Sequence, residues 1–211
     1  MEQKKLLLPR AYLSYSQMTC WLTNKDRFRR EYFEGGPKLD TKYLQFGKGV
    51  ASMIEDGTYK EILPDLEIKG TPEYKIIVEI AGVPCLSYID EYIAHEHYFR
   101  EFKTGKIPWT QAKVQKHEQL PFYAAALKAW TGTMPTHCEL LWFETTEKSI
   151  YDPGGSEQSF WDLVEKKISL TGKTVVFRRD FDEREIERIE RLIRKTAEEI
   201  DCAYRAFLAE I

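Results

Sequence analysis

The stretch of sequence that decides the fold is Ser87-Tyr-Ile-Asp90, which is followed after ten residues by Glu101-Phe-Lys-Thr-Gly105. In an extended strand, successive side chains point to opposite faces of the sheet. Glu101 and Lys103 are therefore predicted to share one face, and Phe102 to point to the other. The Thr-Gly pair that follows Lys103 predicts a turn that opens this face to solvent.

The residues around this stretch are β-branched and aromatic, which predicts antiparallel strands over residues 74–83, 85–94 and 98–103. Tight turns are expected at Gly82-Val83-Pro84 and near His95-Glu96-His97. If the second turn contains two residues, Asp90 lies directly opposite Glu101. If it contains four, Asp90 lies opposite Lys103. Either register brings two carboxylates and an amine to one face, within about 5–8 Å of one another.

Two neighbouring carboxylates repel each other, which destabilises a hairpin unless a cation or Lys103 offsets their charge. Mg²⁺ prefers hard oxygen ligands, commonly one or two carboxylates with water and substrate phosphate. Asp90 and Glu101 fit that requirement. The alternative is an exposed hairpin with ordinary cross-strand ion pairs. A transition-metal site at His95 and His97 is a weaker alternative, because alternate residues of a turn are commonly exposed.

Helices are predicted before and after these strands in the sequence. Apolar residues at helical spacing place them at residues 14–33, 44–56, 119–131 and 182–208, with a short helix at 158–168. Further strands are expected at residues 138–145 and 174–178, with a Gly-rich turn at 153–155. Asp182 followed by Glu185 resembles a capping box at the start of the long last helix. Helices before, between and after a central antiparallel or mixed sheet make an α/β or α+β fold.

The composition suits one globular domain over residues 1–211. Hydrophobic residues make up 43% of the chain, enough for a core, and no apolar run approaches the about 18–20 residues that cross a bilayer. The four cysteines are far apart and form no CxxC pair, so we expect free thiols in a reducing cytoplasm. The protein is therefore predicted to be cytoplasmic, without a membrane partner.

The charge is unevenly distributed along the chain. The formal net charge is -3, yet residues 1–50 hold ten basic and five acidic side chains. The first fifty residues thus carry about five positive charges, and the remainder is acidic. A basic N-terminal surface on an acidic body is compatible with the binding of a polyanion at one face.

Five short motifs occur in a particular order. They are Leu13-Ser-Tyr-Ser16 with Arg27-Phe28 downstream, Phe46-Gly47, Tyr88-Ile-Asp90, Glu101-Phe-Lys-Thr-Gly105, and Gln119-Leu-Pro-Phe-Tyr123-Ala. In this order they resemble the PD-(D/E)XK nuclease superfamily, particularly its RecB-like branch of DNA exonucleases and CRISPR-associated nucleases. The resemblance covers about residues 13–127. It implies a restriction-endonuclease-like core, in which helices flank a central mixed sheet.

The resemblance also implies roles for particular residues. Asp90 and Glu101 would coordinate Mg²⁺ or Mn²⁺ together with the Phe102 carbonyl, and Lys103 would position or activate the attacking water. Two further residues, Gln119 and Tyr123, match the Gln-x-x-x-Tyr motif of the branch and would face the catalytic centre or the DNA backbone. Without the family order, Tyr123 would be interpreted as a core aromatic and Gln119 as a polar residue at a helix start.

Two positions depart from the pattern of the branch. RecB-like proteins commonly have a histidine four residues after the helix-opening glycine, where this chain has Ala51. Glu55, one turn further along the helix, could reach the metal instead, or could be a solvated residue at the helix end. Iron-sulfur members have a cysteine before the Arg-Phe pair, where this chain has Asn24, and its C-terminal segment contains only Cys202. No iron-sulfur cluster is predicted.

The sequence thus predicts a Mg²⁺- or Mn²⁺-dependent DNA nuclease, with exonuclease action in DNA repair, recombination or phage DNA processing. The predicted contacts to DNA phosphates are Lys25, Arg27, Arg29, Arg30 and Lys48. One alternative is a catalytically inactive nucleic-acid-binding relative, which Ala51 supports. The other is a protein-interaction subunit with the same fold. A homo-oligomer or a protein partner remains open in every case.

Overall fold

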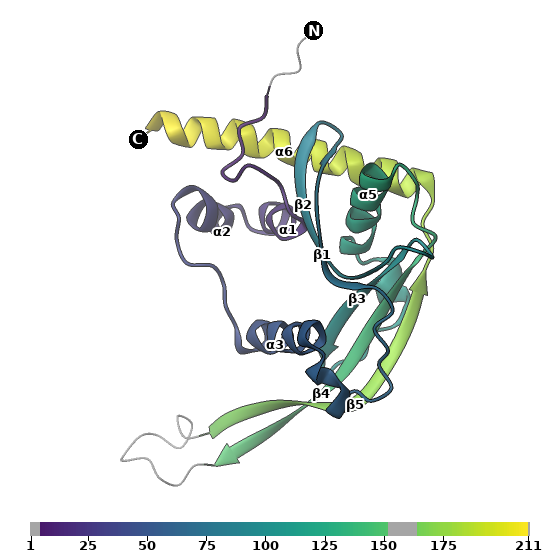
Figure 1. Ribbon diagram of the computed structural model, residues 1–211. Helices are drawn as coiled ribbons and strands as arrows, with labels where there is room; N and C mark the ends of the chain where they lie inside the picture. The colour runs from purple at the N-terminus through teal and green to yellow at the C-terminus, as the bar shows by residue number, and fades with distance from the viewer. Residues whose placement is uncertain (1–4, 152–163, 211) are drawn as a thin grey trace, which may run out of the picture.

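The computed structural model describes residues 5–151 and 164–210, and side chains outside residues 149–166. A five-stranded sheet with the order β1-β2-β3-β4-β5 forms its centre (Figure 1). The strands are β1 (Thr71–Ile80), β2 (Val83–Ile93), β3 (Tyr98–Gly105), β4 (Cys138–Tyr151) and β5 (Val164–Arg179). Strands β3 and β4 are parallel, and the other neighbouring pairs are antiparallel. The predicted mixed sheet is therefore confirmed.

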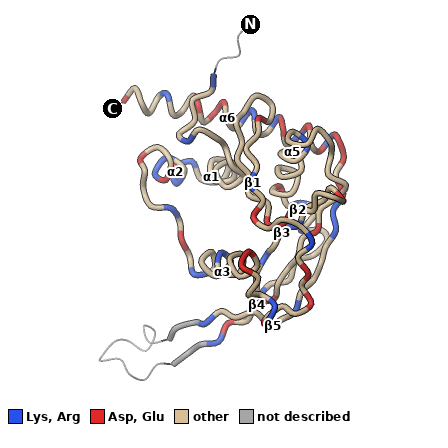
Figure 2. Tube along the Cα trace, viewed as in Figure 1, with Lys and Arg blue, Asp and Glu red and all other residues tan. Residues whose placement is uncertain are grey.

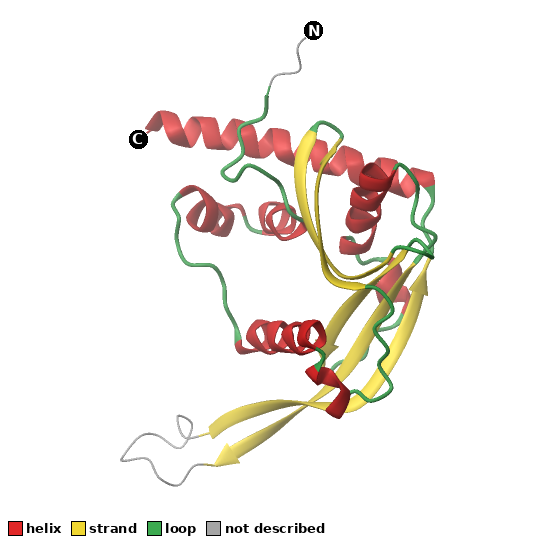
Figure 3. Ribbon diagram, in the orientation of Figure 1, coloured by secondary structure: helices red, strands yellow, loops and turns green. Residues whose placement is uncertain are grey.

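Helices cover both faces of this sheet (Figure 3). The helical elements are α1 (Tyr15–Thr23), α2 (Lys25–Phe28), the π-helix η1 (Arg29–Phe33), α3 (Lys42–Asp56), the 3-10 helix η2 (Thr58–Glu61), α4 (Gln111–Gln115), α5 (Gln119–Thr131) and α6 (Glu183–Glu210). One hydrophobic core joins α1, α5 and α6 to the sheet, and a second joins α3 and η2 to its other face. The architecture is α+β with a long C-terminal helix, as predicted.

The turn between β1 and β2 fixes the register of both strands. Ile80 pairs with Val83, so the turn consists of Ala81 and Gly82 alone. Both have positive φ, 49° and 76°, as a two-residue hairpin turn of type I′ requires. The prediction of a turn at Gly82-Val83-Pro84 was therefore wrong by one residue, because Pro84 is already a strand residue, opposite Glu79.

The sheet splits beyond the first pairs of β2 and β3. These strands pair at Ile93 with Tyr98, Tyr92 with Phe99, and Glu91 with Arg100. The next position in this register sets Asp90 opposite Glu101, as predicted for a two-residue turn at His95-Glu96. The turn itself has four residues, Ala94 to His97, but it has the same centre and therefore gives the same register. There the pairing ends, because the β1-β2 hairpin curls away while β3 continues beside β4 to Gly105 (Figure 1).

The predicted N-terminal helix is interrupted. Ser14 caps α1 in a capping box with Gln17, as expected, but the helix ends at Thr23. Asn24 has φ -158° and its side chain accepts a hydrogen bond from the Arg27 backbone, which starts α2 instead. The prediction of a single helix over residues 14–33 was therefore wrong, because the Asn24 side chain binds a backbone N–H group and caps a new helix.

The segment before the last helix also differs from the prediction. Residues 164–168 lie in β5, paired with β4, so the helix expected there was wrong. Residues 158–163 and the Gly-rich turn at 153–155 lie outside the described residues. Strands β4 and β5 are both longer than predicted, because they continue past the sheet as a two-stranded ribbon (Figure 1).

Helix α6 begins where the sequence predicted. The Asp182 carboxylate accepts a hydrogen bond from the Glu185 backbone at 2.8 Å, which is one half of a capping box. The other half is replaced, because the Glu185 carboxylate binds Arg179. The apolar stripe that includes Ile186 and Ile193 is buried against the sheet and α5. Within residues 5–151 and 164–210, no helix is both long and apolar enough to span a membrane.

Candidate functional site

The point where β2 and β3 separate is occupied by the side chain of Asp90. Its carboxylate accepts a hydrogen bond from the Phe102 backbone N–H at 2.5 Å, in place of a bond between the strands. The N–H and C=O groups of one strand residue point to the same side, so the Phe102 carbonyl faces the same gap. The Phe102 ring points to the opposite face and packs 5.6 Å from Phe143, as the alternation predicted.

Glu101 is the most deeply buried carboxylate of this site. Its side chain is 1% exposed, and one carboxylate oxygen accepts a hydrogen bond from the Lys103 ammonium. The other oxygen, Oε2, is buried and has no hydrogen-bond partner among the described residues. An unpaired carboxylate oxygen is costly in the protein interior. A cation beside Oε2 would remove that cost.

Helix α5 contributes the next two residues of the cluster. The Lys103 ammonium donates to Gln119 Oε1 at 2.9 Å, and Gln119 Nε2 donates to the Tyr123 hydroxyl at 2.9 Å. One helical turn separates Gln119 from Tyr123, so both side chains reach the same place. The structure thus brings Asp90, Glu101, Lys103, Gln119 and Tyr123 together, and their chemical roles stay predictions.

The electrostatics of the cluster favour a bound cation. Burial, together with the Glu101 charge, raises the pKa of Asp90 well above its usual range. Burial lowers the pKa of Lys103, but Glu101 and Asp90 outweigh it, so the net pKa is raised and the ammonium stays charged. The pKa of Tyr123 is raised by burial and by the two carboxylates, which keeps the phenol neutral. One ammonium faces two carboxylates.

Glu73 is a fourth acidic candidate that sequence reasoning missed. Its neighbours Pro72 and Tyr74 pair with Glu91 and Ile89, so Glu73 lies across from Asp90. Its φ of 47° is uncommon for a residue with a side chain, and such strain concentrates at functional sites. Burial, and then the charges of Glu55 and Glu101, raise its pKa. The hairpin register would have revealed it, had the turn been placed at Ala81-Gly82.

Glu55, at the end of α3, lies near Glu73. It is exposed on the last turn of α3 and interacts electrostatically with Glu73. Its part in metal binding stays a prediction. Across residues 5–151 and 164–210, no three His, Cys, Asp or Glu side chains converge closely enough to hold an ion alone. The available donors are the Asp90 and Glu101 carboxylates and the Phe102 carbonyl. This small set fits Mg²⁺, because a bound Mg²⁺ ion keeps several of its water ligands.

Within the described residues, none of the predicted DNA contacts forms a hydrogen bond or ion pair with this cluster. Lys25 pairs with Glu199 and Arg29 with Glu210, so both bind acidic residues of α6. Figure 2 marks the basic and acidic positions along the chain. Arg27 pairs with Glu31, and its Nε lies 3.2 Å from Cys20 Sγ.

Arg30 is exposed on η1, and Lys48 is exposed on α3, where it pairs with Asp40 at 3.5 Å. The two turn histidines do not form a pair either. His97 Nδ1 lies 2.9 Å from the Tyr92 hydroxyl, and His95 contacts Glu96.

No family model matches the sequence, and no curated protein matches it. Solved structures do resemble it. A proposed exonuclease from Eubacterium rectale aligns with a TM-score of 0.55, at 10% identity, over 95% of this chain and 83% of its own. LHK-Exo, solved with dAMP, aligns with a TM-score of 0.51, at 15% identity, over 96% of this chain and 94% of its own.

The chain has the fold of these two structures. A phage-related exonuclease from Haemophilus somnus 129PT shares this fold with a TM-score of 0.50, at 13% identity, over 86% of this chain and 79% of its own. At such low identity the likeness extends to the fold, and the argument for an activity rests on the residues of the site.

Proposed function

We propose that the protein is a divalent-metal-dependent DNA nuclease. The observation that carries the proposal is Glu101, whose buried carboxylate binds Lys103 through one oxygen and has no described partner at the other. Asp90 lies opposite Glu101, where β2 and β3 separate. Two carboxylates, a backbone carbonyl and an adjacent ammonium form the set of groups that phosphodiester hydrolysis with a metal ion requires. The fold shared with exonuclease structures supports the same class of reaction.

Asp90, Glu101 and the Phe102 carbonyl would hold the ion, Mg²⁺ or Mn²⁺. When bound, such an ion lowers the pKa of a coordinated water and offsets charge on the scissile phosphate. The chain's own residues then supply position and charge. The Phe102 N–H fixes Asp90, and Gln119 holds the Lys103 ammonium beside Glu101. A fixed ammonium stabilises negative charge that develops at the phosphate and the attacking water.

The finer parts of the proposal concern substrate and cell biology. We infer exonuclease action on DNA, in repair, recombination or phage DNA processing, within the cytoplasm and without an iron-sulfur cluster. Arg30 is the preferred phosphate contact, because Lys25, Arg27, Arg29 and Lys48 already pair with carboxylates of the chain. Removing a true phosphate contact should lower the salt dependence of DNA affinity by about one unit.

A cleavage assay tests the proposal. Linear and circular DNA, single- and double-stranded, are incubated with Mg²⁺ or Mn²⁺ and either the wild type or Glu101→Gln. Degradation of linear DNA alone, by the wild type alone, supports an exonuclease. Cleavage of circular DNA as well would make the enzyme an endonuclease. Identical background from the wild type and the variant would remove the catalytic claim.

A further inference from the structure

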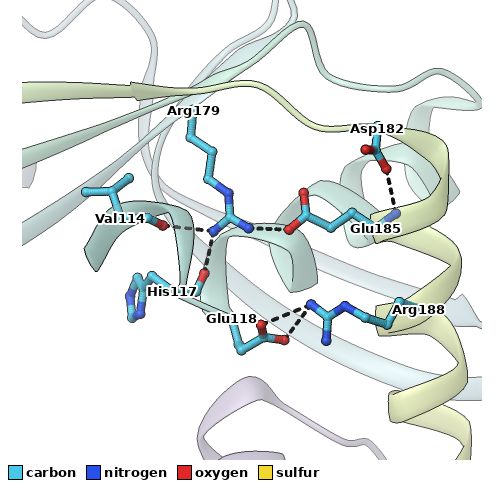
Figure 4. A network of polar contacts seen from close by, with 7 residues as sticks. All are labelled: Val114, His117, Glu118, Arg179, Asp182, Glu185 and Arg188. Atoms are coloured by element: carbon cyan, nitrogen blue, oxygen red, sulfur yellow. Dashed lines mark hydrogen bonds and ion pairs between the residues drawn. The ribbon is translucent and has the colours of Figure 1, made fainter. Parts of the chain in front are cut away.

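Figure 4 shows the guanidinium of Arg179 bound to groups from α4, from the turn after it and from α6. Arg179 is the last residue of β5, and it is 2% exposed. Its Nη1 donates to the backbone carbonyls of Val114 and His117, each at 2.9 Å. Its Nη2 binds the Glu185 carboxylate at the start of α6. One buried side chain therefore ties β5 and α6 to the end of α4.

The two carbonyls that Arg179 binds belong to the C-terminal end of α4 and the turn that follows. Each of them already accepts one backbone hydrogen bond, Val114 from the His117 N–H and His117 from the Leu120 N–H, and Arg179 donates to the second lone pair. A planar guanidinium can donate to two carbonyls and a carboxylate in fixed directions, which an ammonium cannot reproduce. The backbone of this turn is therefore held in one position.

The same turn leads directly into the proposed site. Gln119, the first residue of α5, follows His117 by two positions and accepts a hydrogen bond from Lys103. Glu118, which lies between them, is bound by Arg188 of α6 at 2.8 and 3.0 Å (Figure 4). The N-terminal end of α6 thus holds this turn through two side chains: Arg188 binds Glu118, and Glu185 binds Arg179.

Stability alone is a poor reason for such an arrangement. A buried ion pair can commonly be replaced by well-packed apolar residues without loss of stability. What the arginine provides beyond an apolar side chain is a fixed geometry for its acceptors. The acceptors here are backbone groups two and five residues before Gln119.

We propose that Arg179 is a positioning residue of the nuclease site. It fixes the α4-α5 turn so that the Gln119 amide meets the Lys103 ammonium and keeps it beside Glu101. Its effect on cleavage rests on the proposed function. A small displacement of Gln119 would move the ammonium away from the place where charge develops in the reaction, which lowers the rate more than the binding of DNA.

Two variants separate position from stability. Arg179→Lys keeps the positive charge but loses the planar guanidinium, whose donors have fixed directions. The double variant Arg179→Met, Glu185→Leu replaces the ion pair by apolar side chains and should keep the melting temperature near that of the wild type. Both should lower kcat by about 10²-fold and change KM by less than about twofold. Arg205→Lys is the matched control, because Arg205 also binds a carboxylate, Asp201, and a backbone carbonyl, that of Lys5. It should leave kcat unchanged.

A second readout does not need activity. The side-chain amide signal of Gln119 in the NMR spectrum, assigned by its loss in Gln119→Asn, should shift in both Arg179 variants and stay in place in Arg205→Lys. The proposal is overturned if kcat and the Gln119 signal are both unchanged in Arg179→Lys. It is also overturned if the folded double variant has wild-type kcat. If the wild type cleaves no DNA, the proposed function fails, while the Gln119 signal still decides the role of Arg179.

Discussion

Replacing Glu101 by Gln changes one charge in the buried cluster and almost nothing of its shape. In the metal-free protein the Gln carbonyl can still accept from Lys103, and repulsion toward Asp90 disappears. Removing one partner of a buried ion pair commonly costs about 3–5 kcal/mol, so with these compensations we expect a loss of less than about 3 kcal/mol in the free energy of unfolding.

The effect on metal binding should be much larger. Two unit charges 4 Å apart interact by about 4 kcal/mol at the effective dielectric constant near a protein surface. A divalent ion in contact with Glu101 would gain at least this much from the carboxylate. Because 1.36 kcal/mol corresponds to a factor of ten, we expect Glu101→Gln to weaken Mn²⁺ binding by about 10³-fold.

Calorimetric titration with Mn²⁺ measures this directly. The matched control is Glu139→Gln, which removes a carboxylate paired with Arg100 on the neighbouring strand. The wild type and Glu139→Gln should bind Mn²⁺ equally well. Equal binding by Glu101→Gln would refute the reasoning, because the buried carboxylate would then have no part in the ion site.

Three further outcomes follow from the contacts and pKa shifts of single residues. Lys103→Ala should lower the single-turnover cleavage rate by about 10³-fold and DNA affinity far less; an equal loss of affinity would make Lys103 a DNA contact. Burial, with help from the Lys103 charge, lowers the pKa of His117 to about 4. The folded protein thus prefers neutral His117, and stability should fall by up to about 3 kcal/mol as the pH drops from about 6.5 to 4. His117→Gln should reduce this loss in urea unfolding curves, and an unchanged acid dependence would contradict the assignment. The raised pKa of Glu73 means that folding disfavours its ionised form, a cost that appears as the pH rises above the ordinary range of a Glu. At neutral pH, Glu73→Gln should therefore raise the melting temperature in a chelator and reduce the extra stabilisation by Mn²⁺; a lower melting temperature in the chelator would show that Glu73 is a structural residue.

The centre of the site could be predicted from the sequence because its geometry is local. Alternation along a strand places Glu101 and Lys103 on one face, and a helical turn brings Gln119 and Tyr123 together. These rules depend only on spacing within one element. The position of Asp90 opposite Glu101 needed one further parameter, the place of the turn between β2 and β3, and both registers considered gave a compact cluster.

The rest of the site depends on contacts that spacing does not encode. Glu73 was missed because a turn misplaced by one residue changes the partner of every residue in the hairpin. Arg179 was missed because its acceptors are backbone carbonyls 62 and 65 residues away, which have no signature in the sequence. The basic residues of α2 and η1 were predicted to contact DNA from their charge alone. The positions of their partners Glu199 and Glu210 on the packed α6 could not be inferred from that charge.

The most direct test of the account is a crystal structure with Mn²⁺, analysed by the anomalous scattering of manganese. The account predicts one anomalous peak in the gap between β2 and β3, in contact with carboxylate oxygens of Asp90 and Glu101 at about 2.1 Å, the distance typical of an octahedral ion of this kind. Glu101 Oε2, which has no partner among the described residues, should be one of the ligands. A well-ordered crystal with saturating Mn²⁺ and no peak beside these carboxylates would contradict the central claim.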